Sequence, residues 1–290
     1  MQASSVMRRA RGLWGRAGSA AFVCGLGLVL PPFAMPGARA QAAGLPSELA
    51  CHGSAGKAEA VRLASISDSG ELTLEDGRRI VLAGVWLAQP GRDALRDMLA
   101  PGTGLTVRDL GPEDRWGRRA AQVEAPGGWL QGRLLSDGFA FVLPPVKARG
   151  NAAPAISSEC LRELQLRESV ARKKLGADWG EGVRLRSGDL AGLSERTGLF
   201  TIVEGPVVSL GKSGKTRYLN FGRHWSSDFT VTIDARLDAE LAAKGVPPEA
   251  LEGRWVRVRG ILQDRNGPLL EVTDPVQIEA FARDRVSGGE

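Results

Sequence analysis

The 290-residue sequence contains two histidines, three cysteines and a single tyrosine, and these shortages exclude several kinds of site. His52 and His224 lie far apart and lack a matching set of further ligands, so a zinc site is not expected. The sequence contains no glycine-rich phosphate loop. It also contains no convincing Ser-His-Asp or Cys-His arrangement. Two of its cysteines are better explained by a disulfide. The common marks of zinc enzymes, nucleotide-binding loops and nucleophilic hydrolases are therefore missing.

A long hydrophobic run is also missing. The apolar stretch at 20–30 is shorter than the roughly 20 residues that span a bilayer, and three prolines follow it closely. A basic segment precedes it, and Ala38-Arg39-Ala40 resembles a cleavage site. These features predict a signal peptide at 1–40 that includes Cys24. The mature chain then begins near Gln41, is periplasmic or secreted and has no membrane span; a retained anchor is the alternative.

The predicted mature chain carries no excess of positive charge. The first forty residues contain five arginines and no acidic residue, so 38 − 5 = 33 basic residues remain against 33 acidic ones. Non-specific nucleic-acid binders usually have a basic surplus, because binding depends on neutralising phosphates. A local basic face remains an alternative, but the overall charge does not favour it.

Two cysteines remain after cleavage, and we expect them to pair. Cys51 and Cys160 would close a loop of 160 − 51 = 109 residues. Such a disulfide contributes roughly 4 to 5 kcal/mol in the chain-entropy model. Cysteines in an oxidising compartment usually pair; two buried free thiols are the alternative.

The hydrophobic pattern predicts a mainly β protein with helices (α+β), built from two five-stranded OB-type barrels. In the first half we expect strands at 61–68, 71–74, 78–85, 105–110 and 118–124, with helices at 92–99, 130–135 and 160–174. In the second half we expect strands at 199–210, 217–221, 229–233, 254–262 and 269–272, with a helix at 237–243.

Composition places the domain boundaries in polar and glycine-rich stretches. We expect an N-terminal segment at 41–57, a first domain at 58–181, a linker at 182–197, a second domain at 198–282 and a tail at 283–290.

Four linked motifs give the first domain a family resemblance. They are DGRRIVLAGVWLAQP from Asp76, DRWGR from Asp114, GGWLQGRLLSDGFAFV from Gly127 and ADWG ending at Gly180. In this order and spacing, residues 61–180 resemble the staphylococcal-nuclease-like (thermonuclease) family. The second domain resembles a C-terminal extension of some exported bacterial nuclease-like proteins, through YLNFG, DFTVTI, VRVRG and PVQIE.

The resemblance implies a phosphodiesterase site in which two Asp hold calcium, a Glu activates water and two Arg stabilise the phosphate. Most of these residues are replaced here. The Asp-Gly-Asp-Thr turn falls on Asp68-Ser69-Gly70-Glu71, which keeps only the first Asp. The first Arg falls on Val81, the second metal-binding Asp on Trp86 and the Glu on Gln89. Only the second Arg remains, as Arg118.

We therefore expect a catalytically degenerate barrel with no metal and no cofactor. Gln89 cannot act as a base at neutral pH, and Trp86 replaces an oxygen ligand with bulk. The alternative is a divergent metal-dependent nuclease that cleaves DNA or RNA, with calcium bound by Asp68, Glu71 and Glu75. Alternating strand faces argue against the convergence of these three carboxylates.

Several residues are candidates for binding. Arg118 is a residual phosphate clamp or the structural partner of Asp114. Trp86, Trp116 and Trp129 either stack bases or belong to the core. In the second half the candidates are Tyr218, Phe221, Arg223 and Trp225, where aromatic and cationic residues alternate as on OB-fold binding faces, with core packing as the alternative.

These features predict an exported module of the cell envelope that binds or scaffolds rather than cuts. Its ligand is an envelope protein or a glycan, or else a single-stranded nucleic acid, and the neutral charge favours the first two. A purely structural role for both barrels is a further alternative.

Overall fold

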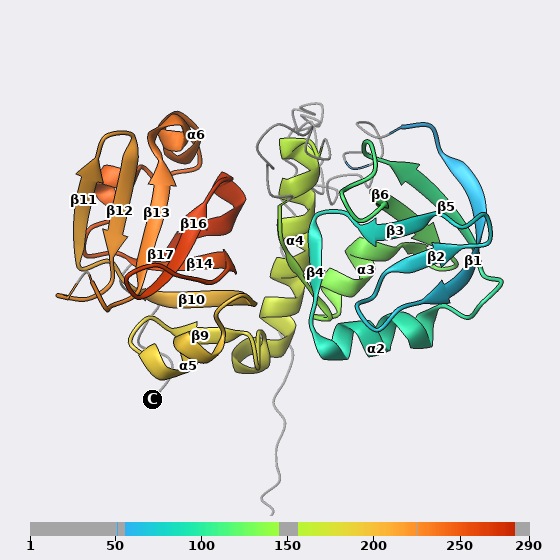
Figure 1. Cartoon of the computed structure of the whole chain (residues 1–290), viewed down its shortest axis with the longest axis horizontal. Helices are drawn as coiled ribbons and strands as arrows, with labels where there is room; N and C mark the ends of the chain where they lie inside the picture. The colour runs from blue at the N-terminus through green and yellow to red at the C-terminus, as the bar shows by residue number, and fades with distance from the viewer. Residues whose placement is uncertain (1–50, 52–55, 145–155, 225, 282–290) are drawn as a thin grey trace, which may run out of the picture. The chain divides into compact units, whose positions relative to one another are not determined.

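The computed structural model describes residue 51 and residues 56–144, 156–224 and 226–281 (Figure 1). This part of the chain is a mixed α+β protein, mainly of strands, with five helices. None of these helices combines the length and the apolar character needed to cross a membrane. The predicted signal peptide and the tail at 283–290 lie outside the described residues. From residue 43 onward the chain forms one compact unit, so the predicted domain boundaries stay a prediction.

Five strands of the first half close into a barrel. Its strand order is β3-β2-β1-β5-β6, and β6 returns to pair with β3 in parallel. The closed barrel is compatible with an OB-like fold and confirms the expectation for this region. Its strands are β1 (Glu59–Ile66), β2 (Leu72–Leu74), β3 (Arg79–Leu82), β5 (Gly104–Asp109) and β6 (Arg118–Ala125).

The barrel closes because alternate residues of its strands are apolar. Leu72 and Leu74 on β2, and Ile80 and Leu82 on β3, are buried in one hydrophobic core. Shorter elements complete this half (Figure 1). They are β4 (Val85–Leu87), α2 (Gln89–Met98), β7 (Gly128–Trp129), α3 (Leu130–Ser136) and β8 (Ala140–Val142).

The strand predicted at 78–85 is interrupted by a glycine. Gly84 has a φ of 79°, a left-handed conformation, and it separates β3 from β4. The chain therefore leaves the barrel, and β4 pairs with β8 in a separate two-stranded sheet. Helix α2 begins three residues earlier than predicted, at Gln89, because Pro90 fits a first helical turn.

Helix α4 (Ser158–Leu175) confirms the long helix predicted at 160–174. Its first turn is capped by Ser157, whose hydroxyl accepts a hydrogen bond from the backbone N–H of Cys160 at 3.1 Å. Cys160 forms the predicted disulfide with Cys51. The bond therefore fixes the start of α4 to the segment that precedes the barrel.

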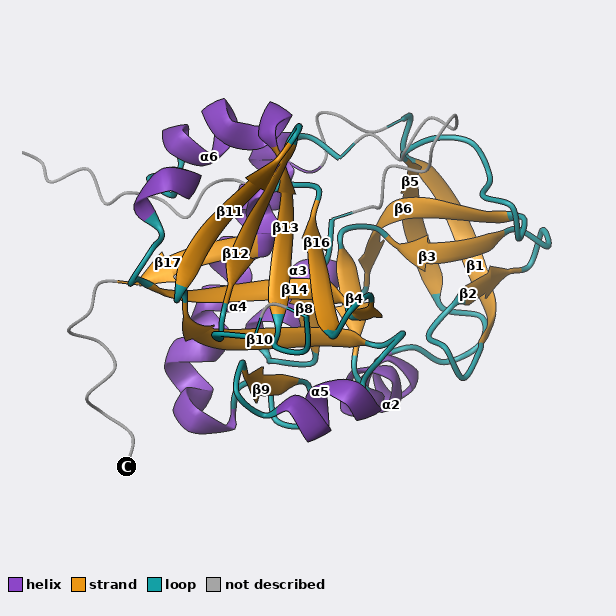
Figure 2. Cartoon of the chain, turned by 60° about the vertical axis from the view of Figure 1, so that its left-hand side comes forward, coloured by secondary structure: helices purple, strands orange, loops and turns teal. Residues whose placement is uncertain are grey.

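The second half contains two sheets packed on a common core (Figure 2). One sheet has the order β17-β14-β10-β9, and the other β11-β12-β13-β16-β15. These pairings do not show the second closed barrel that we expected. The strands are β9 (Arg184–Arg186), β10 (Phe200–Pro206), β11 (Ser209–Ser213), β12 (Thr216–Asn220), β13 (Thr230–Asp234), β14 (Trp255–Ile261), β15 (Gln263–Asp264), β16 (Pro268–Val272) and β17 (Ile278–Phe281).

The stretch predicted as a linker is part of this structure. It contains β9, which pairs in parallel with β10, and α5 (Leu190–Glu195). Leu193 is fully buried in the core of the second half. The high polar and glycine content suggested a linker because these elements are short and only a few of their residues face the core. The predicted short helix is present as α6 (Asp238–Ala243).

A buried group of charged residues joins α4 to the second half. Glu168 accepts hydrogen bonds from Nη1 of Arg259 on β14 at 2.6 and 2.7 Å, and both side chains are almost completely buried. Glu279 on β17 forms ion pairs with Arg259 and with Arg172 of α4. Burial alone would raise the pKa of Glu279, but Arg259, Arg172 and Arg257 together lower it to about 2. We call Glu168, Arg172, Arg259 and Glu279 the interface charge cluster.

Candidate functional site

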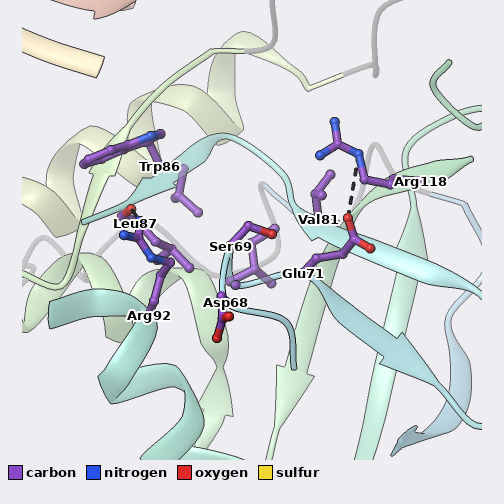
Figure 3. Close-up of a pocket in the computed structure, with 11 residues that line it drawn as sticks. Asp68, Ser69, Glu71, Val81, Trp86, Leu87, Arg92 and Arg118 are labelled. Atoms are coloured by element: carbon purple, nitrogen blue, oxygen red, sulfur yellow. Dashed lines mark hydrogen bonds and ion pairs between the residues drawn. The ribbon is translucent and has the colours of Figure 1, made fainter. Parts of the chain in front are cut away.

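The candidate site is a pocket on one side of the barrel, with a volume of about 540 Å³. It is lined by Asp68, Ser69, Gly70, Glu71, Val81, Leu82, Val85, Trp86, Leu87, Arg92 and Arg118. Most of the positions that the family resemblance marked for calcium and phosphate therefore line one cavity. In Figure 3, Arg118 and Glu71 lie at one end of the pocket, and Trp86 and Arg92 at the other.

At one end of the pocket, the partly buried carboxylate of Glu71 is paired with two arginines. It forms ion pairs with Arg79 at 3.4 Å and with Arg118 at 3.8 Å (Figure 3). Arg118 also donates hydrogen bonds to Asp114 at 2.7 and 2.9 Å, which is the structural pairing that the sequence suggested. Burial tends to raise the pKa of Asp114, but hydrogen bonds from Arg118 and Trp116 hold it below its ordinary value. This end of the pocket is already charge-balanced.

Asp68 is exposed and its carboxylate points away from Glu71 and Arg118 (Figure 3). It forms an ion pair with Arg96 of α2 at 3.0 Å. Glu75, the third carboxylate considered for a rebuilt site, does not line the pocket. Within the described chain, no group of three or more His, Cys, Asp or Glu side chains is placed to hold a metal ion. The three carboxylates are not brought together.

Gln89, at the position of the general base, begins α2 and does not line the pocket. Its amide nitrogen donates to the carboxylate of Asp93 at 3.1 and 3.2 Å, and its oxygen accepts from Arg92 at 2.6 Å. The side chain of Gln89 therefore bonds only to described residues of its own helix, α2.

Trp86, at the position of a metal-binding Asp, belongs to an aromatic cluster that connects the two halves. Its ring stacks on Phe200 of β10 with a centroid separation of 4.7 Å and lies 6.3 Å from Phe141. Phe141 also contacts Phe200 and the buried Trp179. Trp86 therefore forms a wall of the pocket and contacts the second half at the same time.

Arg92 lines the pocket, although no motif in the sequence marks it as a site residue. Its guanidinium donates to the backbone oxygen of Leu87 at 2.9 Å and to Gln89 at 2.6 Å. Its Nε atom is buried and has no hydrogen-bond partner among the described residues. The available signal was a cation early in a helix beside an apolar run. On its own that pattern is too common to indicate a site.

The other two tryptophans considered as stacking platforms differ from each other. Trp129 is buried in the barrel core and donates a hydrogen bond to Gln122 at 2.9 Å, which supports the core alternative. Trp116 is about half exposed, with the guanidinium groups of Arg115 and Arg118 over its ring at 3.9 and 4.6 Å. The loop that carries Trp116 therefore presents an aromatic surface beside Arg118.

The candidates in the second half do not form one described surface. Phe221 is buried against Phe229, with ring centroids 4.8 Å apart, and belongs to the core. Tyr218 is partly exposed on β12, opposite Gly211 and Thr232 of the neighbouring strands. Arg223 is exposed in the loop that follows, and Trp225 lies outside the described residues.

No protein-family model matches the chain, and no curated protein is significantly similar to it. The residues of the pocket and the closed barrel are therefore the basis for assigning a function.

Proposed function

We propose that this protein is an exported, thermonuclease-like module of the cell envelope that binds or scaffolds and does not cleave phosphodiester bonds. Its first barrel would be a degenerate nuclease-like domain, and its second half a divergent OB-like domain. The Cys51–Cys160 disulfide is consistent with an oxidising compartment. The predicted signal peptide gives the same location, which is the periplasm or the exterior of the cell.

The side chains that line the pocket are the main support for this proposal. A hard divalent cation needs several converging oxygen ligands. Here Val81 and Trp86 offer none, and Glu71 is paired with two arginines. Asp68 forms an ion pair with Arg96 and points away from the other carboxylate. These residues do not fit a calcium site of the nuclease type.

The chemistry of the attacking water leads to the same conclusion. A general base must lie within hydrogen-bond reach of the water that it activates. Gln89 has no basic group and is bonded to Asp93 and Arg92. An arginine of the pocket can bind an anion, but binding without a base or a metal gives recognition and not hydrolysis.

The proposed partner is an envelope protein or a glycan, and single-stranded nucleic acid is the competing choice. The neutral mature chain offers little general attraction for a phosphate backbone. An oligonucleotide affinity that falls steeply with salt and is reduced in Tyr218→Ala would assign nucleic acid instead. A salt-independent interaction with one envelope component agrees with the proposal.

A degradation assay tests the proposal. Plasmid DNA, single-stranded DNA and RNA are incubated with the mature protein and calcium, magnesium or manganese. We expect no cleavage above the level of a buffer control. Metal-dependent cleavage that is abolished by Asp68→Ala or Arg118→Ala would refute the proposal and establish the divergent nuclease.

A further inference from the structure

Arg92 is a partly buried cation whose partners are neutral. It donates one hydrogen bond to the backbone carbonyl of Leu87 and one to the amide oxygen of Gln89. A guanidinium carries five N–H donors, so several remain unused. One of these, at Nε, is buried without a partner in the described part of the chain. Nothing described on the protein supplies a negative charge to this group.

The other cation of the pocket differs from Arg92 in this respect. Arg118 forms ion pairs with Asp114 at 2.7 Å and with Glu71 at 3.8 Å. A charge that is withdrawn from water normally has an opposite charge beside it, because desolvation is costly. Arg92 is therefore the pocket group most open to an external anion.

The pocket also offers an apolar surface beside its charged groups. Val81, Val85, Leu87 and Trp86 line it, and its volume of about 540 Å³ is sufficient for a small molecule. The Trp86 ring is held in place by its stack on Phe200. A ligand that uses both surfaces must combine one negative group with an apolar body.

We propose that this pocket binds a small organic anion, with the negative group on Arg92 and the apolar body on Val81, Val85 and Trp86. The inference rests on the proposed function, because a binding barrel needs a ligand site. Carboxylates, phosphates and sulfonates share the required chemistry, and competition experiments separate them.

Two fluorescent dyes test the proposal on the mature protein. 8-Anilinonaphthalene-1-sulfonate carries an aromatic body and one anionic group, whereas N-phenyl-1-naphthylamine has the same body without the charge. We expect saturable binding of the sulfonate dye to the wild type. In Arg92→Gln its affinity falls about tenfold or more, since a charge-assisted hydrogen bond is lost. Arg92→Lys retains most of the affinity, and the neutral dye does not distinguish Arg92→Gln from wild type.

Arg133→Gln is the matched control. Arg133 also bonds to a neutral oxygen, the carbonyl of Pro126 at 3.0 Å, but it does not line the pocket. We expect both dyes to bind this variant as they bind wild type. Val81→Asp should weaken both dyes, because it places a carboxylate on the apolar surface. Unchanged binding of the sulfonate dye in Arg92→Gln, or no saturable binding to wild type, would overturn the proposal.

Competition identifies the anionic group. Displacement of the sulfonate dye by phenylacetate assigns a carboxylate ligand, and displacement by phenyl phosphate assigns a phosphate. Displacement by neither would contradict the inference. Its failure differs from that of the proposed function: metal-dependent cleavage overturns the function, whereas Arg92-independent dye binding without cleavage overturns only the ligand site.

Discussion

The interface charge cluster and the candidate pocket both contain arginines that are partly or fully withdrawn from water, but their charges are compensated differently. In the cluster, Arg259 is fully buried and pairs with Glu168 and Glu279. In the pocket, Arg92 contacts neutral oxygens and has an unpartnered Nε atom within the described chain. Arg259 also has a buried Nε atom without a hydrogen-bond partner in the described chain, so the difference lies in the charge. Arg259 has two carboxylate partners, whereas Arg92 has none among the described residues.

This difference separates a structural role from a binding role. The interface charge cluster holds α4 against β14 and β17, and its acidic members have basic partners. We therefore expect substitutions there to affect mainly the free energy of unfolding. Substitutions at Arg92 should affect ligand affinity and leave the fold almost unchanged.

The largest expected effect is that of Arg259→Met. The substitution leaves Glu168 buried without its counter-ion, which typically costs about 3 to 5 kcal/mol. Urea denaturation of the mature protein measures the loss. Arg236→Ala, which breaks an exposed ion pair with Asp234, is the control and should produce no measurable change. A loss below about 1 kcal/mol in Arg259→Met would remove the structural role of the cluster.

Phe200→Ala should destabilise the protein by about 3 kcal/mol, because it removes a buried ring from the aromatic cluster. The tryptophan emission of the protein should also shift to the red, because water reaches the ring of Trp86. Leu199→Ala is the neighbouring control, since that side chain is half exposed. If Phe200→Ala left both stability and emission unchanged, the stack would not support the pocket wall.

Acid should weaken the interface charge cluster. The pKa of Glu279 is about 2 in the folded protein, below the ordinary value of 4.5. Its contribution to stability is therefore complete above about pH 4.5 and is lost as the pH falls toward 2. Urea midpoints between pH 6 and 2.5 should fall less steeply in Glu279→Gln than in wild type. The exposed Glu271→Gln should follow the wild type, and equal slopes for all three proteins would contradict the assignment.

The smallest expected effect is that of Arg92→Gln on stability, within about 0.5 kcal/mol of wild type. The guanidinium has no ionic partner in the described chain, so its removal leaves no opposite charge without a partner there. Urea denaturation without added ligand is the measurement. A loss above about 1 kcal/mol would show that Arg92 serves the fold and not a ligand.

The sequence was informative wherever a periodic apolar pattern faced a single core. The alternation in β2 and β3 predicted buried strands, and the long helix and the disulfide were also predicted correctly. The pattern was less informative in the second half. There a short parallel strand, β9, and helix α5 make few core contacts, and their glycine-rich sequence suggested a linker.

The candidate site was predicted in part. Motif spacing located most of the lining positions, including Asp68, Trp86 and Arg118. It could not show that Trp86 stacks on Phe200, because these residues lie 200 − 86 = 114 positions apart in the sequence. It also could not select Arg92, because only the folded chain shows that none of the described residues is an ionic partner of this arginine.

Terbium luminescence tests the central claim most directly. Terbium(III) takes the same oxygen ligands as calcium. Because Trp86 lines the pocket, it would sensitise the emission of a terbium ion bound there. Our account predicts that any emission from the mature protein is weak, is not saturable and is the same in Asp68→Ala. Saturable emission that calcium displaces, and that Asp68→Ala and Glu71→Ala abolish, would contradict it.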